Sequence, residues 1–179
     1  LARIGADVVA AEEALGEDAW ILDRGLPPLA WNERLRKAAW KHNLDMIKGM
    51  YFDSVSPEGV GPDQRIESAG YEAEVVLETL GAFLYKDFDS PLILALIICD
   101  KMLKDELNPA LGGPRNILNP DVTEVGIKLE TAAFDVGETE AVKVYLVAAD
   151  FARPAEHRAF VVGNVYRDLD GDGALGPGE

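Results

Sequence analysis

The strongest chemical pattern in the sequence is a run of acidic residues at its C-terminal end, YRDLDGDGALGPGE, residues 166–179. Carboxylate and carbonyl oxygens at alternate positions of a twelve-residue loop, with a closing glutamate, bind Ca²⁺. Gly173 permits the sharp turn that such a loop needs. The pattern therefore predicts a calcium site, and an acidic turn without a metal is the alternative. The predicted ligands are Asp168, Asp170, Asp172, the carbonyl of Ala174, and Glu179.

The residues around this loop predict a strand before it, at 159–166, and no helix after it, because Pro177-Gly178 follow. The arrangement resembles the strand and calcium loop that open small β-sandwich repeats of bacterial surface proteins. We therefore expect two units, a domain over residues 1–152 and a C-terminal segment over 153–179 that could be the start of a further module. The boundary is expected at Arg153-Pro154-Ala155-Glu156.

Composition restricts the classes of partner. The net charge is -15, from 32 acidic and 17 basic residues, so a nucleic-acid backbone would be repelled. The longest apolar stretch, 91–99, is shorter than the ~20 residues that a membrane-spanning helix needs. Cys99 is the single cysteine and lies within that stretch, which predicts a buried core residue and excludes an intrachain disulfide.

Hydrophobic periodicity predicts helices in the first part of the chain and strands in the second. The expected helices cover 6–22, 32–50 and 91–107, with a weaker one at 72–84. The expected strands cover 122–131, 141–152 and 159–166, and 134–139 has the composition of a hairpin turn. This order predicts an α+β layered fold.

Three segments, read in order, resemble the CAP superfamily, the SCP-like domain of cysteine-rich secretory, antigen 5 and pathogenesis-related proteins. They are LPPLAWNERLRKAAWKHNLDM (26–46), YFDSVSPEGVGPDQRIESAGY (51–71) and GGPRNILNPDVTEVGIKL (112–129). The resemblance spans about residues 5–152. It implies an α-β-α sandwich, with an antiparallel sheet between helical layers, and a location that is extracellular, periplasmic or on the cell surface.

The family's cleft typically holds a divalent metal between two histidines and two acidic residues, and this sequence departs from that pattern. Ser54 and Gly113 occupy the histidine positions, and Glu78 matches the family glutamate. Either Asp100 or Glu106 could be the second acid. Zinc is therefore not expected, and Glu78, paired with Asp53 or Glu58, is a weak candidate for catalysis.

Two histidines remain in the chain. His42 lies on the apolar stripe of the helix expected at 32–50, which predicts a hydrogen-bonded structural residue rather than a ligand. His157 lies in the boundary loop.

These observations favour a non-catalytic extracellular or cell-envelope module that binds a protein, glycan or lipid and carries a structural calcium ion. Two alternatives stay open: a divergent, protease-like hydrolase that uses Glu78, and a protein that binds a lipid or sterol in an apolar groove.

Overall fold

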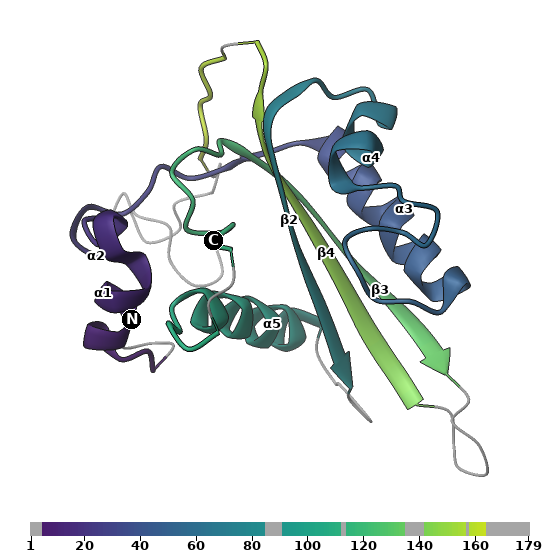
Figure 1. Cartoon of the computed structure of the whole chain (residues 1–179), viewed down its shortest axis with the longest axis horizontal. Helices are drawn as coiled ribbons and strands as arrows, with labels where there is room; N and C mark the ends of the chain where they lie inside the picture. The colour runs from purple at the N-terminus through teal and green to yellow at the C-terminus, as the bar shows by residue number, and fades with distance from the viewer. Residues whose placement is uncertain (1–4, 85–90, 112–113, 135–141, 157, 164–179) are drawn as a thin grey trace, which may run out of the picture.

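The computed structural model describes residues 5–84, 91–111, 114–134, 142–156 and 158–163, arranged as helices on both faces of a central sheet (Figure 1). The α+β class and the helix-sheet-helix layering predicted from the sequence are confirmed. No described helix is long and apolar enough to cross a membrane.

The sheet has four strands in the order β1-β3-β4-β2. They are β1 (Ala30–Trp31), β2 (Ala73–Leu84), β3 (Glu124–Phe134) and β4 (Val142–Pro154). The predicted hairpin is confirmed, since β3 and β4 pair antiparallel up to Phe134 opposite Val142. β2 also pairs antiparallel with β4, but the short β1 runs parallel to β3, so the sheet is mixed rather than wholly antiparallel.

The helix expected at 72–84 is wrong, because this segment is the long edge strand β2. Its sequence, AEVVLETLGAFL, contains β-branched residues and a glycine, which disfavour a helix. Pairing with β4 along nearly the whole strand decides the conformation. The strand expected at 159–166 is not found in its described part either, since residues 158–163 form no strand.

One face of the sheet is covered by α3 (Glu33–Gly49) and α4 (Pro62–Ser68). The α3 helix matches the sequence prediction. The Asn32 side chain caps it by accepting hydrogen bonds from the amides of Arg34 (2.9 Å) and Leu35 (3.3 Å). Its buried stripe contains Leu35, Ala38, Ala39, His42, Asn43 and Met46. At Gly126 of β3 the helix lies so close that a Cβ atom would be 2.0 Å from the backbone nitrogen of Arg36.

The opposite face is covered by α5 (Pro91–Glu106), as the sequence predicts. Its buried side chains, Leu94, Ile98 and Met102, pack with residues of the sheet, among them Val147 and Phe151. Cys99 is exposed, so its predicted place in the core is wrong. The reason is that α5 turns only one stripe toward the sheet, and Cys99 lies beside that stripe.

The N-terminal segment packs against the end of α5, where Ala11, Leu15, Ile21 and Leu107 form a separate apolar cluster. The single helix expected at 6–22 is wrong, because the chain forms α1 (Val8–Leu15), the short 3₁₀ helix η2 (Gly16–Asp18) and α2 (Ile21–Arg24). Gly16, with a φ of 55°, ends α1, since its backbone is in the left-handed region that favours glycine.

Candidate functional site

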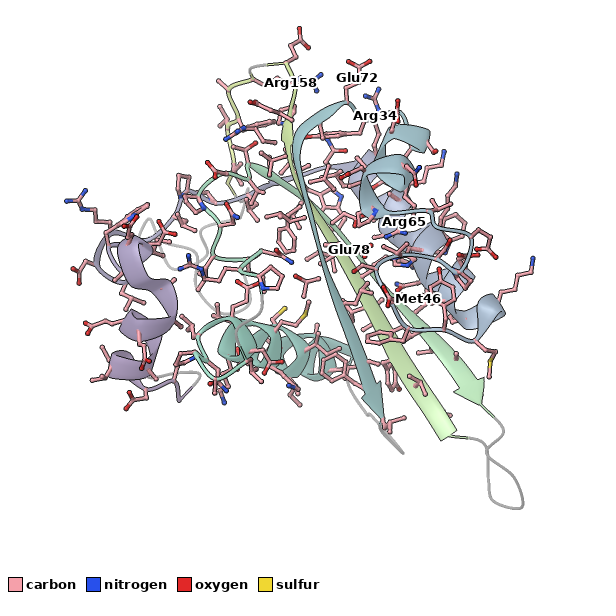
Figure 2. All side chains as sticks on the ribbon, in the orientation of Figure 1. Arg34, Met46, Arg65, Glu72, Glu78 and Arg158 are labelled. Atoms are coloured by element: carbon pink, nitrogen blue, oxygen red, sulfur yellow. The ribbon has the colours of Figure 1, made fainter. Side chains whose placement is uncertain are left out.

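A cluster of buried titratable side chains lies between α3, α4 and the sheet, centred on Glu78 of β2 (Figure 2). Its other members are His42 of α3, Arg65 of α4 and Asp150 of β4. The side chains of His42 and Glu78 are 0% and 1% exposed. The fold therefore collects around Glu78 residues from distant parts of the chain, since His42 and Asp150 are more than 100 positions apart in the sequence.

His42 is held on both sides of its ring. Nδ1 lies 2.8 Å from Oε1 of Glu78, and Nε2 lies 3.1 Å from the carbonyl oxygen of Asp53. Both partners are hydrogen-bond acceptors, so both bonds form together when both ring nitrogens carry a hydrogen. The prediction that His42 is a hydrogen-bonded structural residue is confirmed.

Arg65 joins the cluster to the loop between α3 and α4. Its Nη2 donates to Oε1 of Glu78 and to the carbonyl of Ser54, each at 2.8 Å, and its Nη1 donates to the carbonyl of Val60, also at 2.8 Å. The guanidinium thus fixes the loop that carries Ser54, where the resemblance led us to expect the first histidine.

These contacts keep Glu78 ionised inside the protein. Burial alone would raise the pKa of Glu78, but the hydrogen bond and charge of His42, with the charge of Arg65, hold that pKa below its usual value. A buried carboxylate with two such partners is compensated rather than free to react.

Asp150 lies directly opposite Glu78 in the pairing of β2 with β4, and it is 1% exposed. Burial raises the pKa of Asp150 well above its usual value, and the negative charge of Glu78 raises it further. Neither carboxyl oxygen of Asp150 has a hydrogen-bond partner when Asp150 is ionised, and Oε2 of Glu78 has none either. A proton on Asp150 resolves this, because the neutral acid donates a hydrogen bond to the Glu78 carboxylate.

Three of the acids considered from the sequence, Asp53, Glu58 and Glu106, have hydrogen-bond partners other than Glu78. The Asp53 carboxylate accepts from the amide of Val55 at 3.0 Å, and the Glu58 carboxylate accepts from the Ser56 hydroxyl at 3.0 Å. Glu106 receives the backbone amides of 116–118, at 2.8 to 3.0 Å. The acid next to Glu78 is Asp150, which the sequence reasoning missed.

The loop where the resemblance led us to expect the second histidine is described only in part, because Gly113 lies outside the described residues. After it, Arg115 donates to the carbonyl of Leu15 (2.6 Å) and to the Asp18 carboxylate (3.0 Å), which ties this loop to the N-terminal helices. Asn116 donates to the backbone carbonyl of Glu78 at 2.7 Å and so supports the edge strand β2.

All five predicted calcium ligands, Asp168, Asp170, Asp172, Ala174 and Glu179, lie outside the described residues, as does His157. Within the described part of the chain, no group of three or more His, Cys, Asp or Glu side chains is placed to hold a metal ion. The calcium site stays a prediction.

A separate feature is an apolar cavity of about 320 Å³ between α5 and the sheet. Its lining is almost entirely aliphatic or aromatic and includes Ala95, Ile98, Ile127, Leu129 and Phe151. Cys99 lies at this cavity, on the exposed side of α5.

Comparison with known proteins identifies the family. The profile of the cysteine-rich secretory protein family, CAP, matches residues 22–147, which is most of the chain. The protein belongs to the CAP family. Glu78 and Ser54, the cleft positions expected from the resemblance, both lie within the matched residues of this CAP domain. No curated protein matches the sequence.

Two solved structures are similar to this CAP protein. An extracellular protein containing an SCP domain from Bacillus anthracis str. Ames is 21% identical, with a TM-score of 0.47 over 75% of this chain and 37% of that chain. An outer surface protein from Borrelia burgdorferi is 15% identical, with a TM-score of 0.46 over 82% of this chain and 90% of that chain. The chain thus spans about a third of the length of the first protein.

Proposed function

We propose that this CAP domain acts outside the cytoplasm, on the cell envelope or beyond it, as a non-catalytic binding or scaffold module. The observation that carries the proposal is the environment of Glu78. Glu78 is buried and accepts hydrogen bonds from Arg65 and His42, while Ser54 contributes a backbone carbonyl where a histidine ligand is expected. A carboxylate in this environment positions neighbouring elements and is not available to a substrate.

The second part of the proposal is a structural calcium ion in the loop 168–179. The support is the spacing of its acidic residues in the sequence. Calorimetric titration of calcium into chelator-treated protein should give one binding event, which Asp170→Ala abolishes. Asp63→Ala, which removes an exposed acid of α4, should leave it intact. Equal binding by both variants would overturn the calcium proposal.

Lipid or sterol binding is a second candidate function, and the apolar cavity beside α5 is the observation that favours it. A preformed cavity with this lining suits an apolar ligand. Organic extraction of the purified protein followed by mass spectrometry would detect a retained lipid. Ala95→Trp, which would fill the cavity, should reduce uptake of a fluorescent fatty acid, whereas Ala133→Trp on β3 should not, since Ala133 does not line the cavity. Equal uptake by both variants would exclude this cavity.

A protease-like hydrolase that uses Glu78 remains the other alternative. Hydrolysis of a peptide panel by the wild-type protein, lost in Glu78→Gln, would favour it over the binding module. The hydrolase alternative would be rejected if the wild-type protein hydrolyses no peptide, or if Glu78→Gln hydrolyses peptides as fast as wild type.

A further inference from the structure

The outward face of α3 is cationic, although the protein as a whole is strongly acidic. We define the α3 outer face by its exposed residues Arg34, Lys37, Trp40, Lys41, Leu44 and Lys48. Four of these six are cations, in a chain whose net charge is -15. Figure 2 shows side chains that end in nitrogen projecting from this helix away from the sheet, with Arg34 labelled near its start.

The acids on the same helix offset only part of the positive charge of this face, because the helix carries two acids, Glu33 and Asp45, against five arginine and lysine residues. Glu33 is engaged by Arg36, and the Asp45 carboxylate accepts a hydrogen bond from the Tyr51 hydroxyl at 2.7 Å. Among the residues that the structure describes, no ion pair joins the side chains of Arg34, Lys37, Lys41 or Lys48 to an acid. Unpaired cations grouped on one element are the electrostatic footprint of an anionic partner.

Two apolar side chains stand among these cations. Trp40 lies between Lys37 and Lys41 in sequence and is 38% exposed, and Leu44, one turn later, is 42% exposed. An exposed indole flanked by amines can place its ring against an apolar surface while the amines reach anionic groups beside it. The combination fits a ligand that has both charges and flat apolar faces.

The narrow shape of the α3 outer face favours a linear polyanion over a flat anionic surface. From Arg34 to Lys48 the helix rises about 21 Å, and this strip is only one helix wide. A flat anionic surface in contact with this strip would also approach the rest of the acidic molecule and be repelled by it. A linear polyanion that follows the helix meets mainly the cations.

We propose that the α3 outer face binds a linear anionic polysaccharide. Its sulfate, carboxylate or phosphate groups lie against the arginine and lysine side chains, and the apolar face of a sugar ring packs on Trp40. This assignment rests on the binding role proposed above and names its ligand class. It depends on neither the calcium loop nor the Glu78 cluster, so it is tested separately from them.

The test uses the complete chain and dextran sulfate as the probe, with uncharged dextran as the matched probe. Calorimetry should detect binding of dextran sulfate only, and the affinity should fall as salt rises, because the contacts are ionic. In the double variant Lys37→Glu with Lys41→Glu the affinity should fall at least about tenfold, since each reversal removes an attraction and adds a repulsion.

The control for charge is the double variant Lys104→Glu with Lys143→Glu, which changes two exposed lysines away from α3 by the same total charge. Its affinity should stay close to wild type. Trp31→Ala is the control for Trp40→Ala, since Trp31 is also exposed, at 57%, but lies on β1. Only Trp40→Ala should weaken binding. Unchanged thermal unfolding of these surface variants will show that each is folded.

Four results would overturn the proposal. They are an absence of dextran sulfate binding, equal weakening by both lysine variants, equally tight binding to phosphatidylglycerol vesicles, and equally tight binding to single-stranded polynucleotide. The third would assign the face to a membrane surface, and the fourth would reduce it to attraction between opposite charges. Failure of this test with normal calcium binding would leave the scaffold proposal standing.

Discussion

Glu78 accepts hydrogen bonds from His42 of α3 and Arg65 of α4. Removing its charge should show how much these hydrogen bonds contribute to the free energy of unfolding. Glu78→Gln keeps the side-chain size but leaves the Arg65 guanidinium buried without a carboxylate. We expect the free energy of unfolding to fall by about 3 kcal/mol, the usual cost of breaking a buried ion pair. Urea denaturation measures this change.

The matched control is Glu74→Gln on the same strand, because Glu74 is 61% exposed where it meets Arg153. An exposed pair of this kind contributes less than about 1 kcal/mol. A loss in Glu78→Gln no larger than in Glu74→Gln would contradict the view that the cluster holds α3 and α4 on the sheet.

Asp150 gives the protein a dependence of stability on pH. Its folded pKa is raised, so the folded state binds a proton that the unfolded state releases as pH rises above the ordinary aspartate value. The free energy of unfolding should therefore fall between that value and the folded pKa, by at most about 1.4 kcal/mol per pH unit. Glu78 has the opposite effect on the free energy of unfolding. Its pKa is lowered in the folded state, so its contribution to stability is lost only in acid, as the pH falls below the pKa that Glu78 has in the unfolded state.

Asp150→Asn removes this titration and keeps a donor toward Glu78. The stability of the variant relative to wild type should increase as pH rises from about 4, the ordinary aspartate pKa, toward neutrality. Urea denaturation across this range, with the exposed Asp105→Asn of α5 as control, measures the difference. A difference that stays constant with pH would mean that Asp150 is ionised in the folded protein.

The residues of this cluster differ in how visible they are in the sequence. The helical spacing of His42 indicates a buried structural role, and the family resemblance singles out Glu78. Asp150 was missed because its partner is set by the register of β2 against β4, which a sequence does not display. A signal was present nonetheless, since Asp150 is the single charge in the apolar run 144–152.

At the scale of elements, the contact of α3 with β3 depends on Gly126. A Cβ atom there would lie 2.0 Å from the Arg36 nitrogen and 2.4 Å from the Leu35 carbonyl carbon, both backbone atoms that cannot move alone. Gly126→Ala should therefore lower the free energy of unfolding by at least about 1–3 kcal/mol, the usual cost of overpacking. Chemical denaturation measures this loss.

Gly61→Ala is the matched control, because a Cβ atom at Gly61 meets nothing within 4 Å and its φ is -90°. It should cost less than about 1 kcal/mol, because alanine is a poorer N-cap residue than glycine but meets no steric clash here. Equal losses in the two variants would show that α3 can move away from the sheet at no cost.

Element prediction from the sequence succeeded where local signals and packing agree. The helices α3 and α5 have clear start signals and apolar stripes, and the hairpin strands are rich in β-branched residues. It failed for β2, whose local pattern is ambiguous until β4 pairs with it, and for residues 6–22, where Gly16 divides one expected helix. The short α4, which carries Arg65, had too few residues for a periodic signal.

In the whole molecule, positive and negative charges lie in different places. Acidic residues dominate the chain, the buried cluster compensates its own charges, and the unpaired cations of the α3 outer face stand on the helix that also supplies His42 to the core. One helix thus contributes an inner face that fixes the fold and an outer face available to a partner. This division fits a scaffold or binding module better than a catalytic cleft.

Zinc titration tests whether the cleft residues expected from the family resemblance now form a structural cluster. Zinc would be added calorimetrically to chelator-treated Asp170→Ala protein, in which the predicted calcium loop is disabled. We expect no stoichiometric zinc binding, because Glu78 is occupied by Arg65 and His42 and no histidine stands at position 54. Stoichiometric binding that disappears when Glu78→Gln is added would contradict it and return Glu78 to a metal-binding, hydrolytic role.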